Sequence, residues 1–178
     1  MSVSDKRRRL SVPGLTVPIR IRPARMAELD RLAGIGLAAW ERGIAPLVPT
    51  QVWDRVRAAN PFRPFLRQRG PSIIVADLDD EPAGIAARDG AGDYISDLWV
   101  APGREGRGVG SALLAALEAA IAQAGHGTAR LEVLTANARA LALYRRRGYR
   151  PVWEAFKRDL TLGIELHKTG LAKSLPLA

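Results

Sequence analysis

The stretch PGREGRGVGSALL, residues 102–114, holds four glycines and two arginines directly ahead of an Ala/Leu-rich run. Glycine lets a backbone approach an anion without a Cβ in the way. Where such a loop opens a helix, the N–H groups of the first turn and the helix dipole attract negative charge. The spacing therefore predicts an anion site on a strand–loop–helix unit rather than a plain surface turn.

Two common phosphate motifs do not fit this stretch. Gly103 and Gly108 have the spacing of a P-loop, but Val109 and Gly110 follow where that motif needs Lys and then Ser or Thr. A dinucleotide-binding fingerprint needs a third glycine where Ser111 stands, and it belongs in a βαβ unit. Neither motif explains the glycines.

The stretch resembles the acyl-CoA loop of the GCN5-related N-acetyltransferase (GNAT) family, whose pattern is Gln or Arg, two residues, Gly, one residue, and Gly or Ala. Gly108 and Gly110 match the two small positions, while Glu105 stands at the Gln/Arg position. A carboxylate there would lie beside the cofactor's pyrophosphate, so we expect its side chain to point away. The backbone and Arg104 or Arg107 would then hold the phosphates.

Two further stretches carry the same resemblance. VPIRIRPARMAELDRL is similar to the family's opening strand and first helix, and NARALALYRRRGY is similar to its late motif. The residues at the late-motif positions are Asn137, Ala140, Tyr144 and Gly148-Tyr149.

The resemblance implies an enzyme that transfers an acetyl group directly from acetyl-CoA, as co-substrate, to a primary amine, without a metal. A small amine, an amino acid, an antibiotic and a protein N-terminus are all open as acceptors. A primary amine has a pKa near 10 and is mostly protonated at neutral pH. The site must therefore take up a proton, stabilise an oxyanion and reprotonate the leaving thiolate.

The resemblance also suggests which residues act in catalysis. Tyr144 is the candidate general acid, and Glu132, Asp97 or a water relay is the candidate general base. Tyr94 stands where other members keep a glutamate, so that base is absent. The amide N–H of Val100 is the expected oxyanion donor.

The strand end at residues 98–100 is expected to carry a β-bulge that splays two strands, so that free backbone groups pair with the pantetheine amides. Asn137 is expected to cap a helix and to contact the pantetheine arm, and Trp40 and Trp99 to line the acceptor site. The residues expected to bind the cofactor are Leu98, Trp99, Val100, Glu105, Gly106, Arg107, Gly108, Val109, Gly110, Ser111, Asn137 and Tyr144.

Apolar periodicity predicts the elements that position these residues. The order is a strand, two helices, three antiparallel strands, a helix after the glycine loop, a strand, a helix and two final strands. Thr50 is expected to cap the second helix, and the prolines of NPFRPF to break the pattern. The expected segments are strands 17–23, 72–78, 83–88, 94–100 and 129–134, helices 24–40, 50–59 and 137–148, a helix from residue 109 that ends near Gly125 and Gly127, and strands within PVWEAF and GIELHK.

This order predicts a mixed α/β fold. The resemblance makes it a GNAT-like, mostly antiparallel central sheet flanked by about four helices, with a V-shaped splay between the central strands. A chain of 178 residues suits one domain, expected at residues 18–168. Residues 1–17 are expected to form a flexible basic tail, and residues 169–178 a C-terminal tail.

Composition limits the other classes of function. The chain has no cysteine and two histidines, which argues against disulfides, a cysteine nucleophile and a multi-histidine metal site. No segment approaches the roughly 18 apolar residues of a membrane span, and the first residues lack the apolar core of a signal peptide. We therefore expect a cytoplasmic protein with no membrane partner.

The formal charge of +9 leaves further readings open. It suits an anionic cofactor or an acidic partner, and an Arg- and Ala-heavy composition also arises in GC-rich genomes. A nucleic-acid-binding module could use Lys6–Arg9 and Arg145–Arg147, but few aromatic residues are available for stacking, so nucleic acid is not the expected partner. A regulatory protein that binds acyl-CoA without turnover is a third hypothesis, and a homodimer is left open.

Overall fold

The computed structural model describes residues 18–89 and 92–176, so the expected basic tail at residues 1–17 lies outside the described residues. The strands are β1 Arg20–Pro23, β2 Ile74–Leu78, β3 Glu81–Asp89, β4 Tyr94–Val100, β5 Thr128–Leu134, β6 Arg150–Asp159 and β7 Ile164–Ser174. The α-helices are α1 Leu29–Gly43, α2 Thr50–Ala59, α3 Phe62–Arg69, α4 Val109–Gln123 and α5 Ala138–Arg146.

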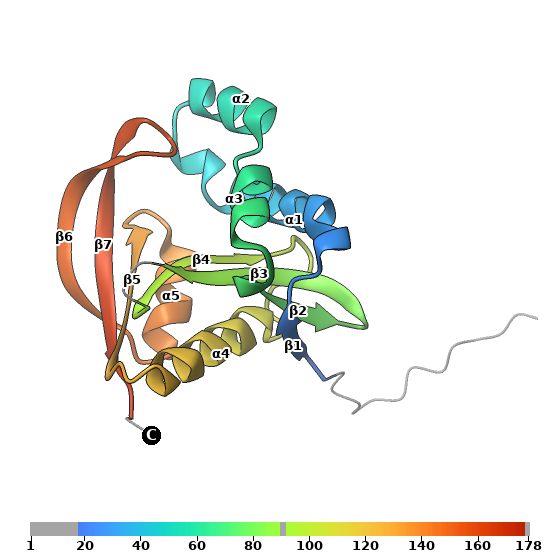
Figure 1. Ribbon diagram of the computed structural model, residues 1–178. Helices are drawn as coiled ribbons and strands as arrows, with labels where there is room; N and C mark the ends of the chain where they lie inside the picture. Colours follow the sequence, from blue (N-terminus) through green and yellow to red (C-terminus); the bar gives the residue numbers. More distant parts are fainter. Residues whose placement is uncertain (1–17, 90–91, 177–178) are drawn as a thin grey trace, which may run out of the picture.

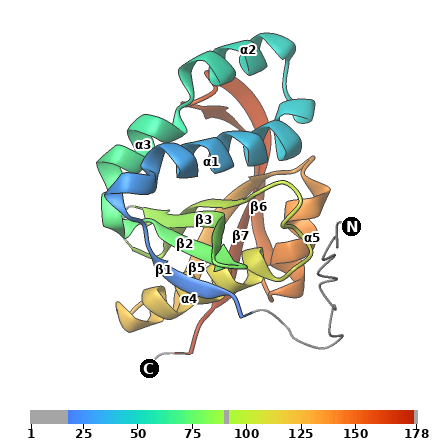
Figure 2. The same cartoon turned by 90° about the vertical axis from the view of Figure 1, so that its right-hand side faces the viewer.

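The strands form one sheet in the order β1-β2-β3-β4-β5-β7-β6, in which only the β4–β5 pair is parallel. Helices α1, α2 and α3 lie over one face of the sheet, and α4 and α5 lie over the other (Figures 1 and 2). The expected mixed, mostly antiparallel α/β fold is confirmed, with five α-helices in the described part instead of about four. None of the helices described is long and apolar enough to cross a bilayer.

Alternation along the strands divides the apolar residues between two cores. Val75 and Ile85 face α1 and α3, while Ala76 and Ala86 face α4. These small alanines, with Gly84, leave room for α4 to lie close to the sheet, because a Cβ on Gly84 would be 3.0 Å from Val109 Cγ1. The start of α4, where the glycine loop ends, is therefore held firmly against the sheet.

The parallel strands β4 and β5 diverge soon after they meet. Their ladder has a single pair, Tyr94 with Arg130, and this confirms the splay between the central strands. The expected bulge at residues 98–100 is wrong in position. The β3–β4 register shifts between Ala87 and Arg88, which places the extra β4 residue at Ser96.

The stretch expected to break the helical pattern contains a helix instead. Asn60 takes a left-handed backbone (φ 37°) that ends α2, and Pro61 stands at the N-cap of α3. Pro64 falls in the first turn, where a helix needs no N–H donor. Thr50 is the first residue of α2 and makes no capping hydrogen bond, so its expected N-cap role is wrong.

The last strand extends past the boundary expected at residue 168. Residues 169–174 of β7 pair with β5 as far as Thr128 with Ser174, so they belong to the sheet and not to a tail. Their own backbone hydrogen bonds to β5 hold them there.

Candidate active site

Two adjoining hollows occupy the space that opens between β4 and β5. The central cleft, of about 490 Å³, lies between α1, α3, β4, β5 and the β6–β7 hairpin. The loop groove, of about 370 Å³, lies between the end of α1, the glycine loop, the start of α4 and α5. The residues shared by both are Ile44, Leu98, Trp99, Asn137 and Ala140.

The glycine loop presents a free helix N-terminus to the loop groove. Gly103, Gly106 and Gly108 have φ of +80°, +73° and +88°, a backbone region that disfavours side chains with a Cβ. The first hydrogen bond of α4 runs from Ala112 N to Gly108 O at 2.9 Å. The N–H groups of residues 109–111 therefore have no acceptor within the helix and suit an anion.

Three arginines line the loop groove: Arg42 from α1, and Arg139 and Arg146 from α5. None of them was among the residues expected to bind the cofactor. Arg139 and Arg146 are seven residues apart and so share a helix face, which is a visible signal. Only the packed fold shows that this face meets the glycine loop.

Glu105 lies in the loop groove, so the expectation that it points away is wrong. One carboxylate oxygen accepts a hydrogen bond from Gly103 N at 2.7 Å, and the other lies 3.0 Å from Arg42 Nε and 3.3 Å from Arg139 Nη1. Desolvation favours its neutral form, but the backbone N–H groups and both arginines outweigh this and lower its pKa. The carboxylate thus remains charged, and its charge is balanced by one arginine from α1 and one from α5.

Two expected phosphate contacts point elsewhere. Arg104 and Arg107 both pair with Asp79 in the β2–β3 turn, at 2.8 and 3.1 Å, and neither lines the loop groove. The Val109 side chain is buried in the core beneath α4. The Val109 backbone N–H, at the start of α4, still has no acceptor within the helix.

The edge of β4 presents backbone groups to the space between the strands. Ala101 N donates to Ala83 O at 2.8 Å, so the alternation of an antiparallel ladder turns the N–H groups of Val100 and Leu98 away from β3. On that side β5 pairs with β4 only at Tyr94. Both N–H groups are therefore available to a ligand.

Tyr144 reaches the central cleft from α5. It is buried, its ring meets the Tyr149 ring edge-on at 5.7 Å, and its hydroxyl makes no hydrogen bond among the residues described. Burial raises its pKa to about 12, so the phenol stays protonated at neutral pH. Asn137 caps α5 as expected, because its Oδ1 accepts from Ala140 N at 3.1 Å.

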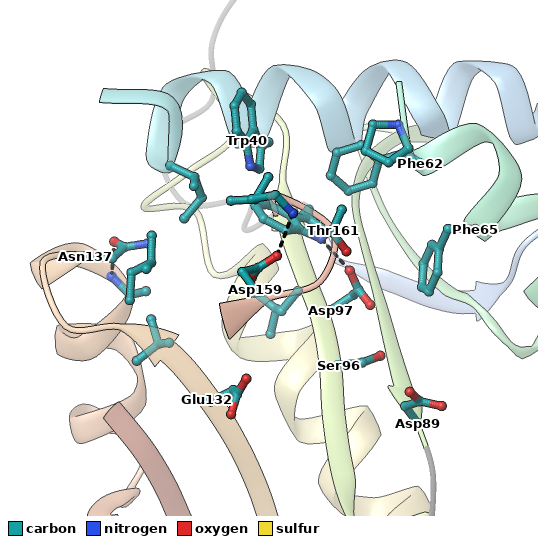
Figure 3. A pocket seen from close by; sticks show the side chains of 18 of the residues that line it. Trp40, Phe62, Phe65, Asp89, Ser96, Asp97, Glu132, Asn137, Asp159 and Thr161 are labelled. Atoms are coloured by element: carbon teal, nitrogen blue, oxygen red, sulfur yellow. Dashed lines mark hydrogen bonds between the residues drawn. The ribbon is translucent and has the colours of Figure 1, made fainter. Parts of the chain in front are cut away.

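The two candidate bases lie across the central cleft from each other (Figure 3). Asp97, on β4, accepts a hydrogen bond from Trp99 Nε1 at 3.0 Å, and burial raises its pKa. Glu132, on β5, is also desolvated, but Lys157 and Lys168 at 2.7 and 3.0 Å lower its pKa below the ordinary value. The environment of Asp97 thus raises its pKa, whereas the environment of Glu132 lowers its pKa.

Aromatic side chains form the wall of the central cleft opposite Glu132. Trp40 and Trp99 line it, and Phe62 and Phe65 from the unexpected helix α3 join them (Figure 3). The Phe62 and Trp99 rings meet edge-on at 5.3 Å. Phe62 fits against α1 because Gly36 has no Cβ, which would lie 2.5 Å from the ring.

Comparisons with known proteins agree with this fold. A family model described as Acetyltransferase (GNAT) family matches residues 37–149. A GCN5-related N-acetyltransferase from Rhodopseudomonas palustris is similar in structure, with 27% identity and a TM-score of 0.73 over 88% of this chain and 95% of that one. A search of curated proteins found no match.

Two more distant structures share the fold. PaiA N-acetyltransferase from Thermoplasma acidophilum, solved in complex with coenzyme A, is 18% identical with a TM-score of 0.70, covering 88% of this chain and 99% of that one. The ribosomal-protein-S18-alanine N-acetyltransferase from Escherichia coli is 21% identical with a TM-score of 0.65, covering 90% and 95%.

Proposed function

The chain belongs to the acetyltransferase (GNAT) family, and from this premise we propose that it transfers an acetyl group from acetyl-CoA to a primary amine. The observation that carries the proposal is the continuity of two hollows. A groove with free backbone N–H groups and three arginines opens directly into a cleft that holds a protonated phenol and a carboxylate of raised pKa.

The loop groove fits the phosphates of coenzyme A. The free N–H groups of residues 109–111, with Arg42 and Arg139, supply donors and positive charge for a pyrophosphate. The N–H groups of Leu98 and Val100 can pair with the amides of a pantetheine arm lying along β4. When bound, acetyl-CoA supplies an activated thioester carbonyl beside the central cleft.

We propose Asp97 as the general base. A carboxylate with a raised pKa holds a transferred proton better than one with a lowered pKa, and the acceptor ammonium must lose a proton before its nitrogen can attack. Glu132 is committed to two lysines, so we assign it a structural role between β5 and the final hairpin.

Tyr144 and Val100 serve the leaving group and the carbonyl oxygen. The Tyr144 phenol retains its proton and can donate it toward the departing sulfur as the carbon–sulfur bond breaks and the carbon–nitrogen bond forms. The Val100 N–H can donate a hydrogen bond to the oxygen that becomes negative during attack.

The test is thiol release from acetyl-CoA over a panel of primary amines, with coenzyme A binding followed separately by the melting temperature. The proposal predicts amine-dependent thiol release and a cofactor-dependent rise in melting temperature. A regulatory protein would show the rise without thiol release. A nucleic-acid-binding module would show salt-sensitive DNA binding and no rise.

Two matched variants separate the candidate bases. Asp97→Asn should abolish most turnover, whereas Glu132→Gln should retain most of it. The reverse order would make Glu132 the base.

A further inference from the structure

The central cleft is negative in a positive protein. The charged side chains that line it are Arg69, Asp89, Asp97, Glu132, Asp159 and Lys168. Four carboxylates against two cations give a formal charge of −2, whereas the whole chain carries +9. This local excess of carboxylates favours a cationic ligand over an anionic one.

Both cations of the cleft already have carboxylate partners. Lys168 Nζ lies 3.0 Å from Glu132 and 3.1 Å from Asp159, and Arg69 pairs with Asp89 while stacking over the Phe65 ring at 5.8 Å. The charge of each cation is therefore already balanced by a carboxylate of the cleft.

Asp97 differs from these pairs, because the positive charge of Arg69 acts on it without forming an ion pair. Among the described residues its carboxylate makes no ion pair, although Trp99 Nε1 donates a hydrogen bond to it at 3.0 Å. It lies on the Phe65 side of the cleft, across from Glu132 (Figure 3). A half-buried carboxylate without a counter-ion is an attractive partner for an ammonium group.

The surface around Asp97 is aromatic. Phe62, Phe65 and Trp99 lie beside it, and Trp40 and Tyr94 complete the wall of the cleft. Such rings bury apolar carbon and also attract cations through their faces. The wall suits the body of a ligand whose charged end reaches Asp97.

The cleft is closed at the end between α2 and the β6–β7 hairpin. Leu162, in the hairpin turn, is buried in the core beside α2, and Arg55 of α2 donates a hydrogen bond to the Leu162 carbonyl. An extended ligand that left the cleft at this end would have to open that contact.

We propose that the acceptor is a small cationic primary amine on an apolar skeleton, aromatic or alkyl, with no carboxylate near its amino group. The inference rests on the proposed function, because it takes the central cleft as the acceptor site. An amino acid would bring its own carboxylate close to Asp97, where both cations are already paired. A peptide N-terminus would also meet the closed end of the cleft.

The test compares 2-phenylethylamine with phenylalanine and an alanyl tripeptide, by thiol release and by equilibrium binding to the coenzyme A-bound protein. We expect kcat/KM for 2-phenylethylamine to exceed that for phenylalanine by at least about 100-fold, since like charges brought together are strongly disfavoured. Its binding should be lost in Asp97→Asn and kept in Asp30→Asn, a carboxylate on the exposed face of α1.

A second pair of variants tests the aromatic wall. Phe65→Ala should raise KM for 2-phenylethylamine about 10-fold through lost apolar contact, while leaving KM for ethylamine nearly unchanged. Phe156→Ala, an exposed phenylalanine of β6 outside the cleft, should change neither.

The outcomes separate the inference from the proposed function. Preferred turnover of phenylalanine or the tripeptide would overturn the inference and leave the acetyltransferase activity standing. Asp97-dependent binding of 2-phenylethylamine without turnover of any amine would keep the cationic-amine site at Asp97 but overturn the proposed function, and with it the amine's role as acceptor. Absence of binding would overturn the inference.

Discussion

At the scale of single residues, the site depends on two carboxylates of opposite character. Asp97 is desolvated and only the more distant Arg69 offsets this, whereas Glu132 is desolvated but hydrogen-bonded to Lys157 and Lys168. This difference in surroundings cannot be seen in the sequence, where both residues are acids on a strand. The lysines that decide it come from the last two strands, 25 and 36 residues away.

Asp97→Asn should lower turnover by about 100-fold or more, as expected for loss of a general base. It should also stabilise the fold. Because the folded-state pKa of Asp97 is raised, the unfolded chain binds fewer protons between the ordinary and the raised value, so stability falls as pH rises through that window. Removing the charge should therefore increase the free energy of unfolding at neutral pH. Each kcal/mol of that increase should raise the melting temperature by about 2–4 °C.

Thermal unfolding of both proteins as a function of pH checks this expectation. The wild type should lose stability relative to Asp97→Asn on going from acid to neutral pH. A variant that is no more stable at neutral pH, or that keeps its turnover, contradicts the assignment.

Tyr144→Phe should lower kcat by about 100-fold while leaving coenzyme A affinity nearly unchanged, because only the proton donor is removed. Tyr149→Phe is the matched control. The Tyr149 ring packs edge-on against Tyr144, with ring centroids 5.7 Å apart, but it does not line the cleft. Steady-state kinetics and calorimetric binding measure both. Equal kcat values for the wild type and Tyr144→Phe would refute the acid role.

At the scale of elements, local signals in the sequence predicted some segments well and missed others. The bounds of β4 and the Asn137 cap of α5 follow from local patterns, and the structure agrees. Helix α3 was missed because its two prolines fall at the N-cap and in the first turn, where proline is tolerated. The aromatic wall was missed in part with it, because Phe65 lies on that helix.

A substitution at Gly108 tests whether the backbone of the glycine loop holds the cofactor. Gly108→Ala places a Cβ on a residue with φ of +88°, 3.4 Å from Ile19, and this costs about 1–2 kcal/mol. Coenzyme A affinity should fall about 10-fold as the loop shifts. Gly34→Ala, in open space on α1, should keep the affinity and add about 0.5–1 kcal/mol of stability.

Calorimetric titration with coenzyme A, together with denaturant unfolding, compares these two variants. An unchanged affinity in Gly108→Ala would show that the loop backbone does not hold the cofactor.

Glu105→Gln tests whether the Glu105 carboxylate competes with the cofactor's phosphates for Arg42 of α1 and Arg139 of α5. Removal of the carboxylate leaves Arg42 and Arg139 without their counter-charge, so the groove becomes more positive, while the amide can still accept from Gly103 N. Coenzyme A should bind several-fold more tightly, and the gain should shrink at high salt. Pantetheine, which lacks the phosphates, should bind unchanged.

Titrations at low and high salt provide the readout for Glu105→Gln. Weaker binding of coenzyme A by the variant would mean that the carboxylate positions the arginines instead of competing with the phosphates.

At the scale of the whole molecule, the divergence of β4 and β5 opens two adjoining hollows whose linings carry opposite formal charge. The loop groove carries Arg42, Arg139 and Arg146 and suits a polyanion, whereas the central cleft carries a formal charge of −2. The fold class was predictable from the order of elements. This separation of charge was not, because it joins residues from α1, α3, α5 and the final hairpin.

The most direct test of the proposed activity measures acetylated amine and free thiol in the same reaction, with the full chain, acetyl-CoA and a panel of primary amines. We expect equal amounts of the two products, dependent on the amine and largely lost in Asp97→Asn. Thiol release that does not depend on the amine, or its absence while coenzyme A still raises the melting temperature, would contradict it.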